Sequence, residues 1–144
     1  MRPASGSFAP DLRHDDAGKL LLRVGLGALI LFHGLAKVYG GPAFILKTVE
    51  GAGLPAFFAY GVYIGEVLAP VLMIIGLWTR PAALVVAVNM LVAVLLVHTK
   101  EFFTLSGTGG WALELQGMFF LAALAVALLG AGRFSVGGAG GRWN

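Results

Sequence analysis

Four apolar runs dominate this sequence, each about as long as the roughly 20 residues that a membrane-spanning helix needs. They cover residues 19–39, 56–78, 81–99 and 111–130. Hydrophobic residues make up 58% of the 144 residues and charged residues only 12%, whereas soluble domains carry about 25% charged residues. Because backbone groups in lipid must be hydrogen-bonded internally, we predict an all-α, transmembrane four-helix bundle.

The segments around these runs set the domain organisation. Residues 1–18 are polar and predict a flexible N-terminal arm, residues 19–136 form the transmembrane domain, and residues 137–144 form a Gly-rich tail that we expect to be disordered. The turn at Arg80 is so short that the second and third helices must be antiparallel neighbours. After the first run, Pro42 and the apolar residues behind it predict a short helix in the membrane interface.

The basic residues are unevenly distributed. If four helices span the membrane, both chain ends and the Arg80 turn share one side, and that side holds Arg2, Arg13, Lys19, Arg23, Arg80, Arg133 and Arg142. The other side holds only Lys37, Lys47 and Lys100. The positive-inside rule therefore predicts a multi-pass protein with both termini in the cytoplasm. Basic residues spread around helix ends give no indication of nucleic-acid binding.

Polar side chains within the runs are the candidate functional residues. An ionisable group in a span costs roughly 2.5–3.5 kcal/mol, so each one needs a role. At about 1.5 Å of rise per residue, most of these side chains fall between the membrane midplane and its outer surface. We therefore expect a polar cavity that opens towards the outer side. Its candidate ligand-binding residues are His33, Lys37, Glu66, Asn89, His98 and Glu114.

Glu66 is the most deeply placed carboxyl group, and Pro70 follows it one helical turn later. Proline has no N–H, so the Glu66 carbonyl loses its usual partner, and a kink would turn carboxyl and carbonyl towards the cavity. His33 and Lys37 are four residues apart and share a helix face. We take Glu66 and His33 as the candidate proton relay, and Arg23 and Pro70 as structural or ion-pair positions.

A structural interpretation stays open for the same residues. Glu66 and a nearby cation could form a buried ion pair that only locks helix packing. His98 and Glu114 lie at run ends, where side chains reach the interface. Asn89 and His98 are nine residues apart, about half a turn out of phase, so an undistorted helix does not point both into one cavity.

The residue inventory excludes several kinds of site. The chain has no cysteine, so disulfides, thiolate metal ligands and thiol redox chemistry are excluded. His33 and His98 differ in depth by about 7 Å, which argues against coaxial haem ligation. A structural metal would need more ligands at one level, so no metal site is expected.

Three stretches carry a family pattern. The first stretch contains an Arg followed by His-Gly-x-x-Lys, in LLRVGLGALILFHGLAKVYG. The second contains Gly-Glu and a closing Thr-Arg, in YIGEVLAPVLMIIGLWTRPAA. The last begins with Glu and ends with Gly-x-Gly-Arg-x-Ser, in ELQGMFFLAALAVALLGAGRFSV. Over residues 19–136 the chain resembles the DoxX family of small four-helix bacterial membrane proteins. The family often has an Asp where this chain has Gly137, so no role for a terminal acid is carried over.

The resemblance implies the bacterial plasma (inner) membrane and a link to redox metabolism. The family is similar to the membrane subunit of a thiosulfate:quinone oxidoreductase. Other members are linked to a membrane complex with a superoxide dismutase and a sulfurtransferase, or to quinone and catechol stress. The resemblance implies that the polar residues typical of the family correspond here to Arg23, His33, Lys37, Glu66 and Glu114.

Three functions are compatible with these observations. The leading hypothesis is a DoxX-like protein of redox or quinone metabolism in the lipid bilayer. Its candidate ligand is a quinone, and no intrinsic cofactor is expected. Its electrons would come from a redox partner protein or a sulfurtransferase. It would then be a subunit and not a complete enzyme. Phe32, Tyr60 and Tyr63 are expected to pack the quinone ring. The alternatives are a proton-coupled small-solute carrier, working as a homo-oligomer, and an assembly or scaffold subunit.

Overall fold

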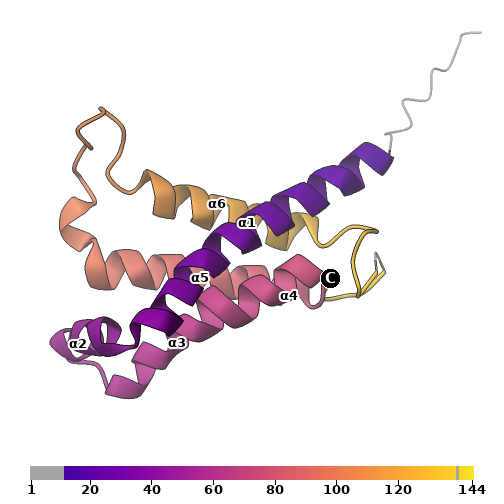
Figure 1. Ribbon diagram of the computed structural model, residues 1–144. Helices are drawn as coiled ribbons and strands as arrows, with labels where there is room; N and C mark the ends of the chain where they lie inside the picture. The colour runs from indigo at the N-terminus through magenta and orange to yellow at the C-terminus, as the bar shows by residue number, and fades with distance from the viewer. Residues whose placement is uncertain (1–11, 139) are drawn as a thin grey trace, which may run out of the picture.

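The computed structural model describes residues 12–138 and 140–144, and these residues are mostly helical (Figure 1). None of them forms a β-strand, so the predicted all-α fold is confirmed. In chain order the elements are α1 (Leu12–Gly40), α2 (Ala43–Gly51), the 3-10 helix η1 (Ala56–Tyr60), α3 (Gly61–Tyr63), the π-helical turn η2 (Ile64–Leu68), α4 (Ala69–Ile75), α5 (Thr79–Val97), the 3-10 helix η3 (Thr99–Glu101) and α6 (Glu114–Leu129).

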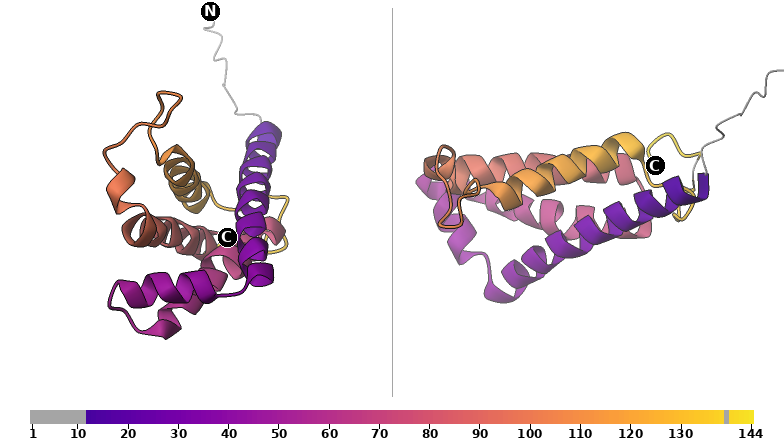
Figure 2. Two further views of the ribbon diagram at one scale, coloured as in Figure 1. Left: turned by 60° about the vertical axis from the view of Figure 1, so that its left-hand side comes forward. Right: turned by 90° about the horizontal axis from the view of Figure 1, so that it is seen from above.

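The helices form a bundle of four rods, of which the second is the continuous stretch from η1 to α4 (Figure 2). α5 packs against α4 and α6, and α1 contacts the same two helices. The core between them contains Leu26, Ile30, Met73, Val86 and Val126. Long apolar side chains also face outwards along the rods, among them Leu21, Leu95 and Leu128. Apolar side chains both inside and outside fit a helical bundle in lipid.

The count of spanning helices differs from the prediction. Within the described residues three helical stretches are long and apolar enough to cross a membrane, at 14–40, 56–75 and 79–97, and not four. The apolar helix α6 has only 16 residues, which at 1.5 Å per residue covers about 24 Å. The run predicted at 111–130 is shorter as a helix because Trp111, Ala112 and Leu113 lie in the preceding turn.

The two predicted terminal boundaries also need correction. α1 begins at Leu12, so residues 12–18 extend the first helix instead of forming an arm, while residues 1–11 lie outside the described part. Asp16 is buried in this helix and its Oδ1 accepts the backbone N–H of Arg133 at 3.2 Å. The short helix predicted after Pro42 is present as α2. Its place in the membrane interface stays a prediction.

The tail predicted to be disordered is docked in the described residues 137–138 and 140–144. The N–H of Gly137 donates to the carbonyl of Gly76 at 3.0 Å. The amide oxygen Oδ1 of the buried Asn144 accepts the hydroxyl of Thr79 at 3.1 Å. Arg80 Nε also donates to the backbone oxygen of Asn144, at 3.0 Å. The glycines therefore permit a tight backbone path against the α4–α5 turn.

Arg23 locks this end of the bundle. Its side chain is fully buried and donates to the carbonyls of Ala131 at 3.1 Å and Met73 at 2.8 Å, and also to those of Ile74 and Phe134. These carbonyls belong to the end of α4 and to the segment after α6. Carbonyls at a helix end have no partner inside the helix, so one guanidinium satisfies groups that would otherwise be buried without a hydrogen bond.

We predict that Arg23→Met lowers the free energy of unfolding by at least about 3 kcal/mol, because several buried carbonyls lose their donor. Thermal or chemical unfolding in lipid measures this change. The matched control is Arg133→Met, whose side chain is 66% exposed and pairs with Asp16 at only 3.9 Å; its loss should stay below about 1 kcal/mol. Equal losses in the two variants would contradict a locking role for Arg23.

Candidate functional site

Glu66 lies in the π-helical turn η2, directly before Pro70 at the start of α4. Because Pro70 has no N–H, the regular helical bond to the Glu66 carbonyl is absent. The helix widens at this point, and Ala69 N–H bonds to the carbonyl of Ile64, five residues back. Such π-helical turns are frequent at functional sites. Glu66 itself is only 4% exposed, so its carboxyl group is inside the bundle.

The carbonyl of Glu66 is not presented to a cavity, contrary to the sequence prediction. It lies against α1 at Gly34, where an added Cβ would overlap the Glu66 carbonyl group. Gly34 therefore permits the close approach of α1 to η2, and its backbone covers the carbonyl that Pro70 leaves without its usual helical partner.

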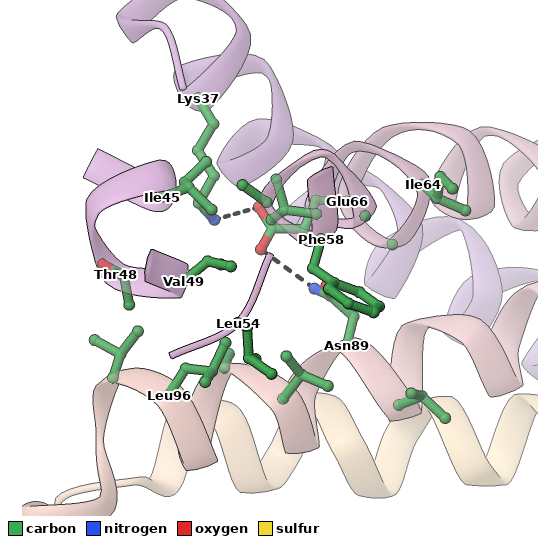
Figure 3. A pocket seen from close by; sticks show the side chains of 18 of the residues that line it. Lys37, Ile45, Thr48, Val49, Leu54, Phe58, Ile64, Glu66, Asn89 and Leu96 are labelled. Atoms are coloured by element: carbon green, nitrogen blue, oxygen red, sulfur yellow. Dashed lines mark hydrogen bonds and ion pairs between the residues drawn. The ribbon is translucent and has the colours of Figure 1, made fainter. Parts of the chain in front are cut away.

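Two elements, α1 and α5, bring polar side chains to the Glu66 carboxylate (Figure 3). Lys37 from α1 forms an ion pair with Oε2, and Asn89 from α5 donates to Oε1 at 3.3 Å. Gly65 makes room for Asn89, because a Cβ there would lie 2.6 Å from the Asn89 Cβ. Tyr63 Oη donates to the Lys37 carbonyl at 3.3 Å. The carboxylate is thus held from two sides.

The ion pair lies at the edge of a cavity of about 440 Å³, the larger of two that adjoin it. Lys37, Glu66 and Asn89 supply its charged and amide groups. The rest of the lining is mainly apolar and comes from α2, η1, α3, η2 and α5, including Phe44, Ile45, Val49, Phe58, Val92 and Leu96. The larger cavity therefore fits a ligand with a polar head and an apolar body.

The aromatic residues of the larger cavity differ from those predicted. Phe44 and Phe58 line it, whereas Phe32, Tyr60 and Tyr63 do not. Phe32 and Tyr60 instead expose their rings on the outside of the bundle. Phe44 comes from α2, between the first two predicted runs, and Phe58 from η1, at the start of the second run.

A smaller cavity of about 280 Å³ also adjoins the ion pair. It shares Lys37 and Glu66 with the larger cavity and adds His33, His98 and Gln116. His33 is largely exposed and packs edge-on against the ring of Phe119, 6.0 Å between centroids. His98 caps the end of α5. Its Nδ1 lies 3.0 Å from Glu101 Oε2 and its Nε2 lies 3.3 Å from Gln116 Nε2.

The structure thus brings together five of the six candidate ligand-binding residues. Asn89 and His98 line different cavities, as their half-turn offset predicts. Glu114 lines neither cavity: it is exposed at the start of α6, where Oε1 accepts the N–H of Trp111 at 3.2 Å. Sequence reasoning missed Gln116. Its signal was a neutral amide near the start of the last apolar run.

Arg23 and Pro70 take structural positions outside the two cavities. Arg23 binds carbonyls at the opposite end of the bundle, and Pro70 is buried behind η2. Within the described residues no group of three His, Asp or Glu side chains is placed to hold a metal ion.

We predict that Gly34→Ala displaces α1 from η2 and separates Lys37 from Glu66, because the methyl group would overlap the Glu66 carbonyl. Its unfolding midpoint in lipid should fall clearly. Gly25→Ala is the matched control on the same helix, since a Cβ there meets nothing within 4 Å. It should be neutral or stabilising by up to about 1 kcal/mol. A Gly34→Ala protein as stable as Gly25→Ala would contradict the close approach.

Comparisons with known proteins place the chain in a family. The DoxX family model matches residues 18–99, more than half of the chain. A protein of Bacillus subtilis (strain 168) named "Putative oxidoreductase CatD" is 35% identical over 85 residues, which cover 59% of this chain and 63% of that protein. The match thus spans less than two thirds of that relative. No solved structure matches. The matched region contains most of α1, the elements from α2 to α5 and the Lys37–Glu66 pair, and the chain belongs to the DoxX family.

Proposed function

We propose that this protein binds the head group of a quinone in the larger cavity and acts as the membrane subunit of a quinone-linked oxidoreductase. One observation carries the proposal: an ion pair with a buried carboxylate stands at the edge of an apolar cavity. A quinone combines a ring bearing two carbonyl oxygens with an apolar body, so its chemistry matches this lining. The relative named as an oxidoreductase supports the redox assignment.

The side chains at the cavity edge can handle the protons of quinone reduction. Reducing a quinone to a quinol takes up two electrons and two protons. Lys37 Nζ can donate a hydrogen bond to a quinone carbonyl oxygen, and the Glu66 carboxyl group can hold and pass on a proton. The chain has no cysteine thiol to supply the electrons. A partner redox protein supplies them in this proposal, and a sulfurtransferase is the candidate that the DoxX resemblance suggests.

The two cavities favour a binding function over a scaffold without a ligand. In a pure scaffold the polar cluster would be paired within dry packing. Here Glu66 is paired with Lys37 and Asn89, but two cavities adjoin the pair. Both cavities are lined mainly from the half of the bundle that carries Lys37 and His98, and neither lining includes the residues around Arg23 at the other end. No observation therefore favours a carrier.

We predict that Lys37→Met weakens the binding of decylubiquinone, a short-tail quinone, in lipid nanodiscs, because the quinone carbonyl oxygen loses its charged donor. A hydrogen bond to a charged group contributes about 1.5–3 kcal/mol, so the dissociation constant should rise about 10- to 100-fold. Isothermal titration calorimetry measures it. Lys47→Met is the matched control, because Lys47 lines neither cavity. An absence of saturable binding to the unmodified protein would refute the proposal.

A second pair of variants separates the two cavities. Val92 lines only the larger cavity and Leu115 only the smaller one. Val92→Trp should fill the apolar space and weaken quinone binding while leaving the ion pair intact, whereas Leu115→Trp should leave the affinity unchanged. Weaker binding in Leu115→Trp, with unchanged binding in Val92→Trp, would indicate that the quinone binds in the smaller cavity.

We also propose that both chain ends face the cytoplasm and that the cavities open towards the outer side. The start of α1 and the segment after α6, which leads into the tail, meet at one end of the bundle through Asp16 and Arg133. Because the chain has no cysteine, single cysteines can be introduced at Lys47 and Arg142 and labelled in intact cells. An impermeant thiol reagent should label Lys47→Cys and spare Arg142→Cys. Labelling of Arg142→Cys alone would contradict this orientation and indicate the opposite one.

A further inference from the structure

The smaller cavity connects the ion pair with an exposed carboxylate. At one side it is lined by Lys37 and Glu66, and at the other by His98, which ends α5. His98 is 28% exposed at its side chain and contacts Glu101, which is 49% exposed. A polar route therefore runs from the surface of the bundle to the buried carboxylate, and none of its outer residues takes part in the proposed quinone contact.

The hydrogen bonds of His98 suit a residue that takes up and releases protons. In the neutral ring Nδ1–H donates to Glu101, and Nε2 accepts the amide N–H of Gln116. When Nε2 also carries a proton, Gln116 can turn its amide so that Oε1 accepts it, because an amide offers both donor and acceptor. Gln116 Oε1 is buried and has no hydrogen-bond partner among the described residues. Both protonation states of His98 thus have a matching partner.

The space between His98 and Glu66 can hold water. The smaller cavity has about 280 Å³ and several polar groups in its lining, whereas one water molecule occupies about 30 Å³ in the liquid. Buried water is expected where polar groups lack partners, as Gln116 Oε1 does. Three titratable groups besides His98 face this space, namely His33, Lys37 and Glu66. Within the described residues His33 has a ring contact to Phe119 and no hydrogen bond, so His98 is the better-placed proton carrier.

We propose that Glu101, His98 and the water of the smaller cavity form the proton pathway that loads Glu66 from outside the bundle. This inference rests on the proposed function, in which Glu66 passes protons to a quinone. His98 takes one proton from the outer solution through Glu101, and its Nε2–H passes one proton to the water chain. The last water gives one proton to the Glu66 carboxylate. Only N–H and O–H bonds break and form, and no electrons move.

The test measures how fast Glu66 becomes protonated after a downward pH jump. The protein is placed in lipid nanodiscs, and the infrared band of the protonated carboxyl group is assigned by its loss in Glu66→Gln. We expect His98→Ala to slow the appearance of this band at least about tenfold, because a positioned proton carrier is removed. Added imidazole should restore the rate, which it would not do if His98 only stabilised the fold. Glu114→Gln serves as the unaffected control.

A second variant keeps the pathway testable if His98→Ala does not fold. His98→Gln retains a hydrogen-bonding side chain but cannot carry a proton, so it too should be slow. A wild-type rate in either His98 variant, or a slow rate that imidazole does not restore in His98→Ala, would overturn the pathway. Decylubiquinone affinity is measured on the same samples and should not change in the His98 variants. If the unmodified protein fails to bind the quinone, the proposed function falls, while the rates still decide the pathway.

Discussion

The ion pair between Lys37 and Glu66 is the interaction on which the cavity half of this protein depends. An unpaired buried charge is costly, so the carboxylate needs its partners in place. Gly34 lets α1 approach closely enough for Lys37 to reach Glu66, and Pro70, at the start of α4, follows the π-helical turn that carries Glu66. Gly65 makes room for Asn89 on the other side. A short stretch of α1, η2 and α5 is therefore built around one carboxyl group.

The two ends of the bundle serve different purposes. At one end Arg23 and the tail satisfy helix-end carbonyls, and the packing is closed. At the other end α2 and the segment after α5 lie beside the rods, and the two cavities adjoin the ion pair. The apolar core of the rods lies between these two ends and holds the helices together. The larger cavity suits an apolar ligand with a polar head, and the smaller cavity reaches towards solvent.

The sequence predicted the helical class for physical reasons, and five of its six candidate polar side chains line the two cavities. Long apolar runs have few alternatives to helices in lipid, and an ionisable group within such a run is rare enough to be noticed, as with Lys37 and Glu66. It did not predict close backbone approaches, because the need for Gly34 appears only when α1 meets η2. Gln116 was missed because a neutral amide is a weaker signal than a charge. The docked tail was missed because glycine-rich composition also fits disorder, and its partners Thr79 and Arg80 lie far away in sequence.

The central claim is that the Lys37–Glu66 pair receives a quinone head group at the edge of the larger cavity. The most direct measurement is an experimental structure in lipid with a saturating quinone analogue. The account predicts a ring in the larger cavity with a carbonyl oxygen within hydrogen-bond distance of Lys37 Nζ. A larger cavity without the quinone ring, or a quinone held elsewhere on the bundle with the ion pair undisturbed, would contradict it.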